Sequence, residues 1–212
     1  MLEGVLRYPY GVLVVNDGST DDTAAILTQY PSVTTITHPK NQGKGKALQT
    51  GFEQARAMGY DYALTLDSDG QHYPEDIPAF IEALAAEELP VLLVGNRDMQ
   101  QEGVPKKSSF GHRFSNFWFR LETGVALPDT QSGFRLYPLH FIPKKYYTRK
   151  FEFEIEILVR SSWCGIAVKP VPIRVLYDPA ERVSHFRPFR DFTRISIIKL
   201  TQIGRASCRE RV

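Results

Sequence analysis

The chain has 212 residues, of which 42% are hydrophobic and 24% are charged. These values are typical of a globular domain with its own core, and they exclude a disordered or fibrous chain. No run reaches the roughly 18 consecutive apolar residues of a membrane span, and no signal peptide is recognisable. The two cysteines, Cys164 and Cys208, are too few for a disulfide framework. We therefore expect a cytoplasmic globular protein.

Strand and helix signals alternate along the first half of the chain. Short apolar runs predict buried strands at residues 12–15 and 91–94. Residues 33–37 are rich in strand-forming residue types, and residues 62–66 predict a further strand. Helices are predicted after capping residues at 19–21, from about residue 46 and from Pro74. The alternation predicts an α/β fold with a mostly parallel, doubly wound sheet and helices on both faces.

Two patterns in the second half have more than one interpretation. Aromatic residues recur at helical spacing from Phe110 to Leu121, which fits a helix packed in the core or one resting on a membrane surface. Residues 151–157 alternate strictly, as in a strand, yet they also place apolar residues at helical spacing. Residues 168–177 predict a strand that is bulged or at a sheet edge, because Pro170 and Pro172 lack a backbone donor.

Both ends of the chain look incomplete. Residues 1–6 resemble the end of a helix and a strand follows closely, so we expect an element upstream of them to be missing. Residues 203–212 read IGRASCRERV, which breaks the apolar pattern and back-translates to a sequence like a common sequencing adapter. We expect one domain over residues 1–202, truncated at both ends, and a non-native tail over 203–212. Without that tail's three Arg and one Glu, the net charge of +2 falls to 0.

Three polar segments lie where a parallel sheet places its binding crevice, at strand ends or before a helix. Asp17 and Gly18 follow the first strand, where Gly18 permits a tight turn and Asp17 could bind a base or ribose. The same residues also suit an ordinary turn with a helix cap. Lys44 lies among glycines just before a helix, a composition that suits phosphate but matches neither a Walker A loop nor a dinucleotide fingerprint.

The third segment contains Asp67, Asp69 and Gln71 directly after the strand at 62–66. Two carboxylates this close repel each other, and a divalent cation removes that repulsion. Oxygen ligands suit Mg²⁺ or Mn²⁺, which usually bind substrate phosphate as well. An EF-hand is excluded because His72 stands at its sixth position and Pro78 at its twelfth. A solvated turn is the alternative.

Together these segments resemble family 2 glycosyltransferases with the GT-A fold, in the branch of dolichyl-phosphate mannosyltransferases and polyprenyl-phosphate glycosyltransferases. The segments that carry the resemblance occur in the family's order between Val12 and Arg194 and read VVNDGSTDDT, NQGKGKAL, LDSDGQHYPEDI, GNRD, DTQSGFRLYP and FEFEIEIL. The resemblance implies a Rossmann-like GT-A sheet, favours a helix over residues 151–160, and implies a further strand before the chain's first one.

The resemblance also implies roles for individual residues. Nucleotide-sugar binding is assigned to Asp17, Gly18, Lys44, Asp67 and Arg97; the metal, Mg²⁺ or Mn²⁺, to Asp67, Asp69 and Gln71; catalysis to Asp69, Asp129 and Arg135; and the acceptor phosphate to Arg135, Arg187 and Arg190. Nucleic acid could bind the basic aromatic run at 182–194, but a net charge near zero argues against that partner.

The expected reaction is an inverting transfer of a sugar from a UDP- or GDP-linked donor to a polyprenyl- or dolichyl-type lipid phosphate. It implies a metal-dependent enzyme of cell envelope glycan synthesis, peripheral at the cytoplasmic face of the membrane, although this truncated chain could be inactive. One alternative is a GT-A enzyme acting on a sugar or protein hydroxyl, with Asp129 as the base that a hydroxyl requires. Another is a non-catalytic nucleotide-binding fragment.

Overall fold

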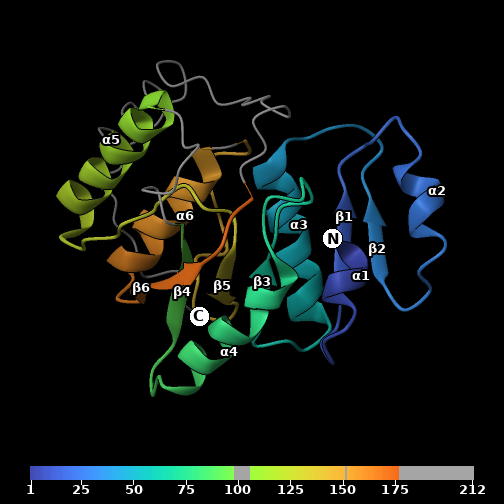
Figure 1. Ribbon diagram of the computed structural model, residues 1–212, viewed down its shortest axis with the longest axis horizontal. Helices are drawn as coiled ribbons and strands as arrows, with labels where there is room; N and C mark the ends of the chain where they lie inside the picture. The colour runs from blue at the N-terminus through green and yellow to red at the C-terminus, as the bar shows by residue number, and fades with distance from the viewer. Residues whose placement is uncertain (98–105, 151, 177–212) are drawn as a thin grey trace.

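The computed structural model describes residues 1–97, 106–150 and 152–176 (Figure 1). The helices are α1 (Leu2–Val5), α2 (Thr23–Leu27), α3 (Lys44–Ala57), the 3₁₀ turn η1 (Pro74–Asp76), α4 (Ile77–Ala85), α5 (Lys106–Thr123) and α6 (Glu152–Trp163). The strands are β1 (Leu13–Asn16), β2 (Thr34–Thr37), β3 (Tyr62–Thr65), β4 (Val91–Arg97), β5 (Arg135–Pro138) and β6 (Ala167–Ile173). All five predicted strands are confirmed, as β1 to β4 and β6. Within the described ranges, no helix combines the length and apolarity needed to cross a membrane.

The described strands form two sheets. β1 pairs with β2 in parallel, and the second sheet has the order β3-β5-β4-β6. β6 is the edge strand that its prolines predicted, and it pairs in parallel with β4. β5 runs antiparallel to both β3 and β4. The sequence did not predict β5, because four residues ending in Pro138 are too short to show alternation.

β1 and β3 belong to different sheets but run in the same direction. Gly11, before β1, lies against the Tyr60 ring, before β3. At the other end, the start of α3 contacts the residues that follow both strands. Each of these two strands pairs on one edge only within the described residues. The further strand expected before β1 stays a prediction.

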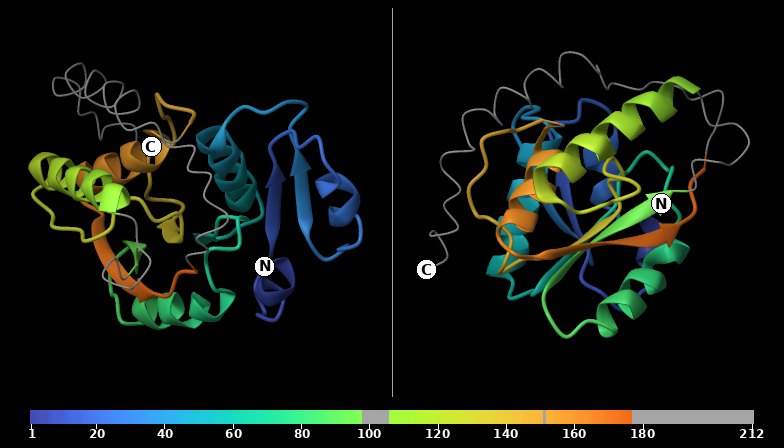
Figure 2. Two further views of the ribbon diagram at one scale, coloured as in Figure 1. Left: turned by 45° about the horizontal axis from the view of Figure 1, so that its top comes forward. Right: turned by 90° about the vertical axis from the view of Figure 1, so that its left-hand side faces the viewer.

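Helices cover both faces of the larger sheet, as expected (Figure 2). Alternate residues of β4 point to opposite faces, which separates two clusters of buried side chains. One cluster joins α3, α5 and α6 to the sheet and includes Phe52, Phe119, Phe153, Leu92 and Val94. The other joins α4 to the sheet and includes Phe80, Val91, Leu93, Phe134 and Ile173.

Of the segment with two interpretations, the described residues 152–157 form the start of helix α6. Its strict alternation is misleading because the polar positions are also buried and paired. Glu156, for example, accepts hydrogen bonds from the backbone N–H and hydroxyl of Thr148 at 2.9 and 2.6 Å. Buried glutamates of this kind have the same spacing as the exposed face of a strand, which the sequence alone does not distinguish.

Candidate active site

The predicted polar segments meet at the carboxyl ends of β1, β3 and β4. Asp17 follows β1, Asp67 follows β3, and Arg97 ends β4. The N-terminus of α3 lies between the first two of these strands and contacts both carboxylates. This edge is the position expected for the binding crevice of a doubly wound sheet.

Asp17 ties the end of β1 to the start of α3. Its carboxylate accepts hydrogen bonds from the backbone N–H groups of Gln42 and Gly43 at 2.9 and 2.8 Å, and its Oδ1 lies 2.7 Å from His38 Nδ1. Burial raises the pKa of Asp17, but the bonds from His38, Gln42 and Gly43 outweigh burial, so that the pKa is lowered. The carboxylate therefore stays charged and fixes the loop before Lys44.

Gly18 is required by the close approach of two segments. Its φ of +71° lies in the left-handed region, and a Cβ there would be 2.5 Å from the backbone nitrogen of Asn41. No side chain fits between the turn after β1 and the loop before α3. The predicted tight turn is present.

Lys44 links two carboxylates from distant parts of the chain. Its Nζ lies 2.7 Å from Asp67 Oδ1 and 3.1 Å from Glu154 Oε1. Burial lowers the pKa of Lys44, but Glu154 and Asp67 outweigh that effect and raise it. The group therefore remains an ammonium beside Asp67. Sequence reasoning gave Glu154 no role, since its only signal was a position in a motif.

The residues assigned to the metal fit a cation that takes further ligands from its substrate. Asp69 and Gln71 are exposed, and the Gln71 N–H donates to Asp69 Oδ1 at 3.0 Å. Asp67 lies against Gly133, where a Cβ would be 2.7 Å from the carboxylate carbon, so the missing side chain leaves the space that Asp67 uses. Within the described ranges no group of three His, Cys, Asp or Glu could hold a metal alone. Two carboxylates and an amide oxygen suit Mg²⁺ or Mn²⁺ completed by phosphate and water.

His72 is a further buried group beside this segment, and sequence reasoning gave it no role. Its side chain packs at a tilt against Phe134 with ring centroids 5.4 Å apart, and its Nδ1 has no hydrogen-bond partner within the described residues. Burial lowers its pKa, which favours the neutral ring. The signal available in the sequence was its place next to Gln71.

Arg97 and Asp129 form an ion pair in which Asp129 is buried and Arg97 is partly exposed. Arg97 donates from Nε and Nη2 to the two carboxylate oxygens at 2.6 and 3.0 Å. His112 Nε2 lies 3.1 Å from Asp129 Oδ1, and the N–H groups of Gln131 and Ser132 also donate to that oxygen. Burial raises the pKa of Asp129, but His112 and Arg97 outweigh it and hold the pKa far below its usual value. Asp129 thus positions Arg97 at the end of β4.

Arg135 lies in the core. Its side chain is 0% exposed and donates to the backbone carbonyls of Ser132, Glu154 and Thr130 at 2.6, 2.7 and 2.9 Å. These bonds join the loop after Asp129 to the start of α6. The geometry favours a positioning role for Arg135 over contact with a phosphate. Arg187 and Arg190 lie outside the described residues, and their roles stay predictions.

The Asp129 pair predicts an acid-sensitive fold. Because the pKa of Asp129 is lower in the folded chain than the ~3.9 of an unfolded aspartate, its stabilisation is present above about pH 4 and is lost as the pH falls further. Asp129→Asn should lower the free energy of unfolding at pH 7 by about 3 kcal/mol, since it removes the buried charge that Arg97 and His112 face. Urea unfolding between pH 3 and 7 measures both effects. Asp61→Asn, at a side chain 82% exposed, is the control and should match the parent chain. An unchanged acid slope in Asp129→Asn would contradict this assignment.

Comparisons with known proteins agree with this geometry. A family model described as glycosyl transferase family 2 matches residues 1–147. The UDP-N-acetylglucosamine–dolichyl-phosphate N-acetylglucosaminyltransferase of Methanococcus voltae is 26% identical, over 91% of this chain and 86% of the relative. The undecaprenyl-phosphate mannosyltransferase of Micrococcus luteus is 28% identical, over 76% of this chain and 70% of the relative.

The structural comparison supports the GT-A fold. Glucosyl-3-phosphoglycerate synthase from Mycobacterium tuberculosis, solved with Mn²⁺, UDP-glucose and phosphoglyceric acid, superimposes with a TM-score of 0.60 at 21% identity. That superposition covers 92% of this chain and 68% of the synthase. At such low identity the likeness concerns the fold alone. Since the family model spans more than half of the residues, this chain belongs to glycosyl transferase family 2 and is a nucleotide-sugar-dependent glycosyltransferase.

Proposed function

We propose that the chain transfers a sugar, with inversion, from a UDP- or GDP-linked donor to a polyprenyl- or dolichyl-type lipid phosphate. The observation that carries this proposal is the convergence of Asp67, Lys44 and Asp69 at one edge of the sheet, since a nucleoside diphosphate needs both a cation site and basic groups. The two curated relatives described above are named for dolichyl-phosphate and undecaprenyl-phosphate acceptors, which supports the lipid phosphate.

The reaction is a single displacement. An acceptor phosphate oxygen attacks the anomeric carbon, while the bond from that carbon to the donor diphosphate breaks and its electron pair leaves with the nucleoside diphosphate. Mg²⁺ or Mn²⁺ on Asp67, Asp69 and Gln71 would supply positive charge to the leaving group. Lys44 lies beside Asp67 and adds a fixed ammonium there. Asp17 and Gly18 shape the loop that presents Lys44.

The geometry favours a phosphate acceptor over a hydroxyl. A phosphate monoester with a second pKa near ~6 is already ionised at pH 7 and needs no general base. Asp129, the base that a hydroxyl acceptor would require, is fully buried with both oxygens held by donors, and its pKa is depressed. In this proposal Asp129 and Arg135 position Arg97 and the loop beside it, and Arg187 and Arg190 contact the acceptor phosphate.

A product assay tests this proposal. The full chain is incubated with Mn²⁺, labelled UDP- or GDP-sugars, and either undecaprenyl phosphate in detergent or sugar and peptide hydroxyl acceptors. We expect label to enter the lipid phosphate with the anomeric configuration opposite to that of the donor. Transfer to hydroxyl acceptors alone would favour the first alternative. Nucleotide binding without any transfer would favour a non-catalytic module.

The setting that follows from this acceptor is the cytoplasmic face of a membrane, where the chain would act peripherally in cell envelope glycan synthesis. The division into a domain over residues 1–202 and a non-native tail over 203–212 also remains a proposal, supported by the break in the apolar pattern.

A further inference from the structure

We propose that the outer face of α5 docks on the surface of a bilayer with anionic headgroups. The outer face is defined here by Arg113, Phe114, Phe117, Trp118, Arg120 and Leu121. The biological role of this docking rests on the proposed lipid-phosphate acceptor. The surface itself is defined by the exposure, ring contacts and charge of these six side chains.

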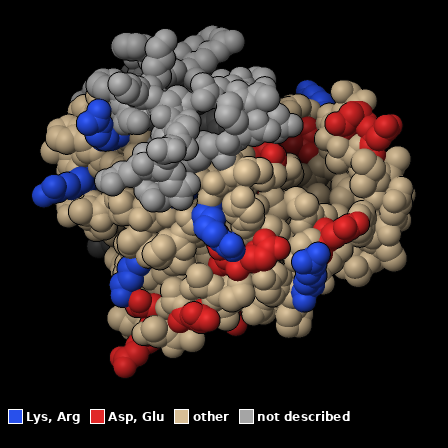
Figure 3. All heavy atoms as spheres, in the orientation of Figure 1, with Lys and Arg blue, Asp and Glu red and all other residues tan. Residues whose placement is uncertain are grey.

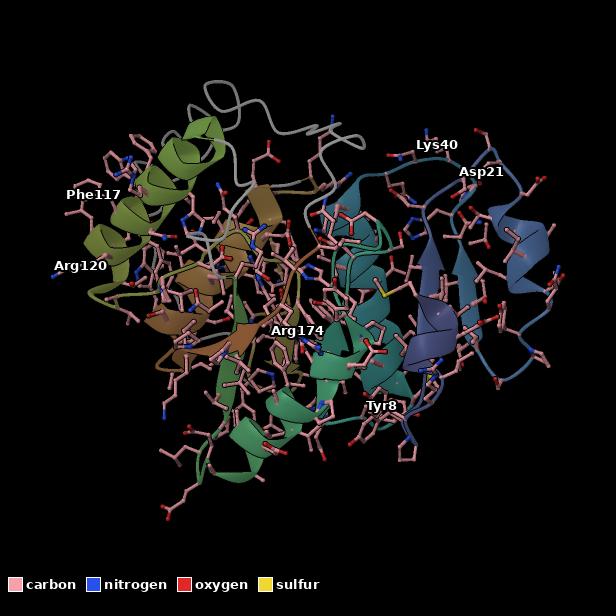
Figure 4. All side chains as sticks on the ribbon, viewed as in Figure 1. Tyr8, Asp21, Lys40, Phe117, Arg120 and Arg174 are labelled. Carbon is pink, nitrogen blue, oxygen red and sulfur yellow. The ribbon has the colours of Figure 1, made fainter. Side chains whose placement is uncertain are left out.

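The outer face exposes a continuous apolar patch. Phe117 is 60% exposed and Leu121 is 62% exposed, and their spacing of four residues places them next to each other on one side of the helix. Trp118 lies between Phe117 and Phe114, with ring centroids 5.9 and 6.0 Å from theirs. Phe117 points away from the sheet in Figure 4. Exposed apolar side chains that adjoin partly exposed aromatic rings mark an interaction site, whereas single exposed apolar residues do not.

The charges of this face select the partner. Arg113 and Arg120 are exposed at three or four residues from Phe117, and residues 112–121 contain no acidic side chain. Figure 3 shows basic side chains among uncharged surface where α5 lies, and Arg120 extends outward beside Phe117 in Figure 4. Aromatic side chains flanked by arginine are the composition of helices that lie in a bilayer interface. Anionic headgroups complement the arginines, so the face fits a lipid surface better than an apolar protein groove.

The inner face of the same helix is tied to the candidate active site. Asn116 Oδ1 accepts hydrogen bonds from the backbone N–H and hydroxyl of Thr130 at 3.0 and 2.8 Å. Ser115 Oγ lies 2.7 Å from the Thr130 hydroxyl, and His112 lies 3.1 Å from Asp129. Because Asp129 holds Arg97, a membrane-bound α5 would fix the end of β4 relative to the bilayer. A phosphate headgroup would then be presented on the side of the site where Arg97 lies.

Co-sedimentation of the full chain with vesicles tests this inference. One set of vesicles is pure phosphatidylcholine and the other contains phosphatidylglycerol. We expect stronger binding to the anionic set. Phe117→Ser with Leu121→Ser should weaken that binding by at least ~10-fold, because two apolar side chains would no longer enter the bilayer. Arg113→Gln with Arg120→Gln should abolish the preference for phosphatidylglycerol. The matched control is Leu89→Ser, since Leu89 is a 77% exposed leucine between α4 and β4 and should not affect binding.

Nucleotide affinity, measured in parallel by calorimetry, separates this inference from the proposed function. Normal nucleotide binding with no vesicle binding, or equal vesicle binding by the Phe117 and Leu121 double variant, would overturn membrane docking and leave the sugar-transfer proposal standing. A dimeric parent chain that the double variant converts to a monomer would assign the outer face to a second copy, which also overturns it. Failure of nucleotide binding with intact vesicle binding would count against the proposed function alone.

Discussion

Replacing Asp67 with Asn is expected to abolish metal-dependent nucleotide binding and to reduce sugar transfer on the order of 1,000-fold. The substitution keeps the size of the side chain but removes a charge that faces both Lys44 and the proposed cation. Charge stabilisation of a leaving group by a metal contributes several kcal/mol, and each 1.36 kcal/mol is a factor of ten in rate. Calorimetry with UDP and GDP, with and without Mn²⁺, and a transfer assay measure the two effects.

Asp61→Asn is the matched control for this substitution. Asp61 precedes β3, whereas Asp67 follows the same strand, and the Asp61 side chain is 82% exposed. Its replacement should leave binding and transfer unchanged. If Asp67→Asn retained metal-dependent affinity within a factor of two of the parent chain, the assignment of Asp67 would be wrong.

Gly133→Ala is expected to separate metal binding from folding. Its new methyl group would lie 2.7 Å from the carboxylate carbon of Asp67 and would push that carboxylate aside. An aspartate side chain can turn at little energetic cost, so the free energy of unfolding should change by less than about 1 kcal/mol. Nucleotide affinity in the presence of Mn²⁺ should fall at least ~10-fold, because metal ligands tolerate little displacement.

Gly51→Ala provides the comparison for this second substitution. Gly51 lies inside α3, and a Cβ there would be 3.6 Å from Val15 Cγ2, an ordinary contact. Alanine should stabilise the helix by about 0.5–1 kcal/mol and leave nucleotide affinity unchanged. Equal affinity in Gly133→Ala and Gly51→Ala would show that the position of Asp67 does not control the cation.

The sequence predicted those parts of the fold whose signal is local. β1 and β4 contain apolar runs, β2 is rich in β-branched residues, and the polar residues after β1 and β3 mark the carboxyl ends where the site lies. The aromatic stripe also predicted a helix, which is α5. Phe117 and Leu121 of that stripe are exposed, whereas the buried aromatic residue of α5 is Phe119, which lies outside the stripe. Parallel strands bring their ends to one edge, so the site could be located without any long-range contact.

The remainder depends on contacts between distant segments. The family resemblance assigns Arg135, which follows the Ser-Gly-Phe segment, to the acceptor phosphate. In the structure its partners are backbone carbonyls that only the folded loop and α6 bring together. Glu154 contacts Lys44 across more than a hundred residues of sequence. His112, on α5, contacts Asp129 in the loop between α5 and β5. No spacing rule in one sequence reports such pairings. The contacts among the charged residues therefore required the structure.

Titration of the full chain with UDP and with GDP, each with and without Mn²⁺, tests the central claim most directly. We predict that one of the two nucleotides binds tightly only when Mn²⁺ is present, and that Asp67→Asn removes this binding while Asp61→Asn does not. Binding that is equally tight without metal, or no binding of either nucleotide, would contradict a metal-dependent nucleotide-sugar site at the end of β3.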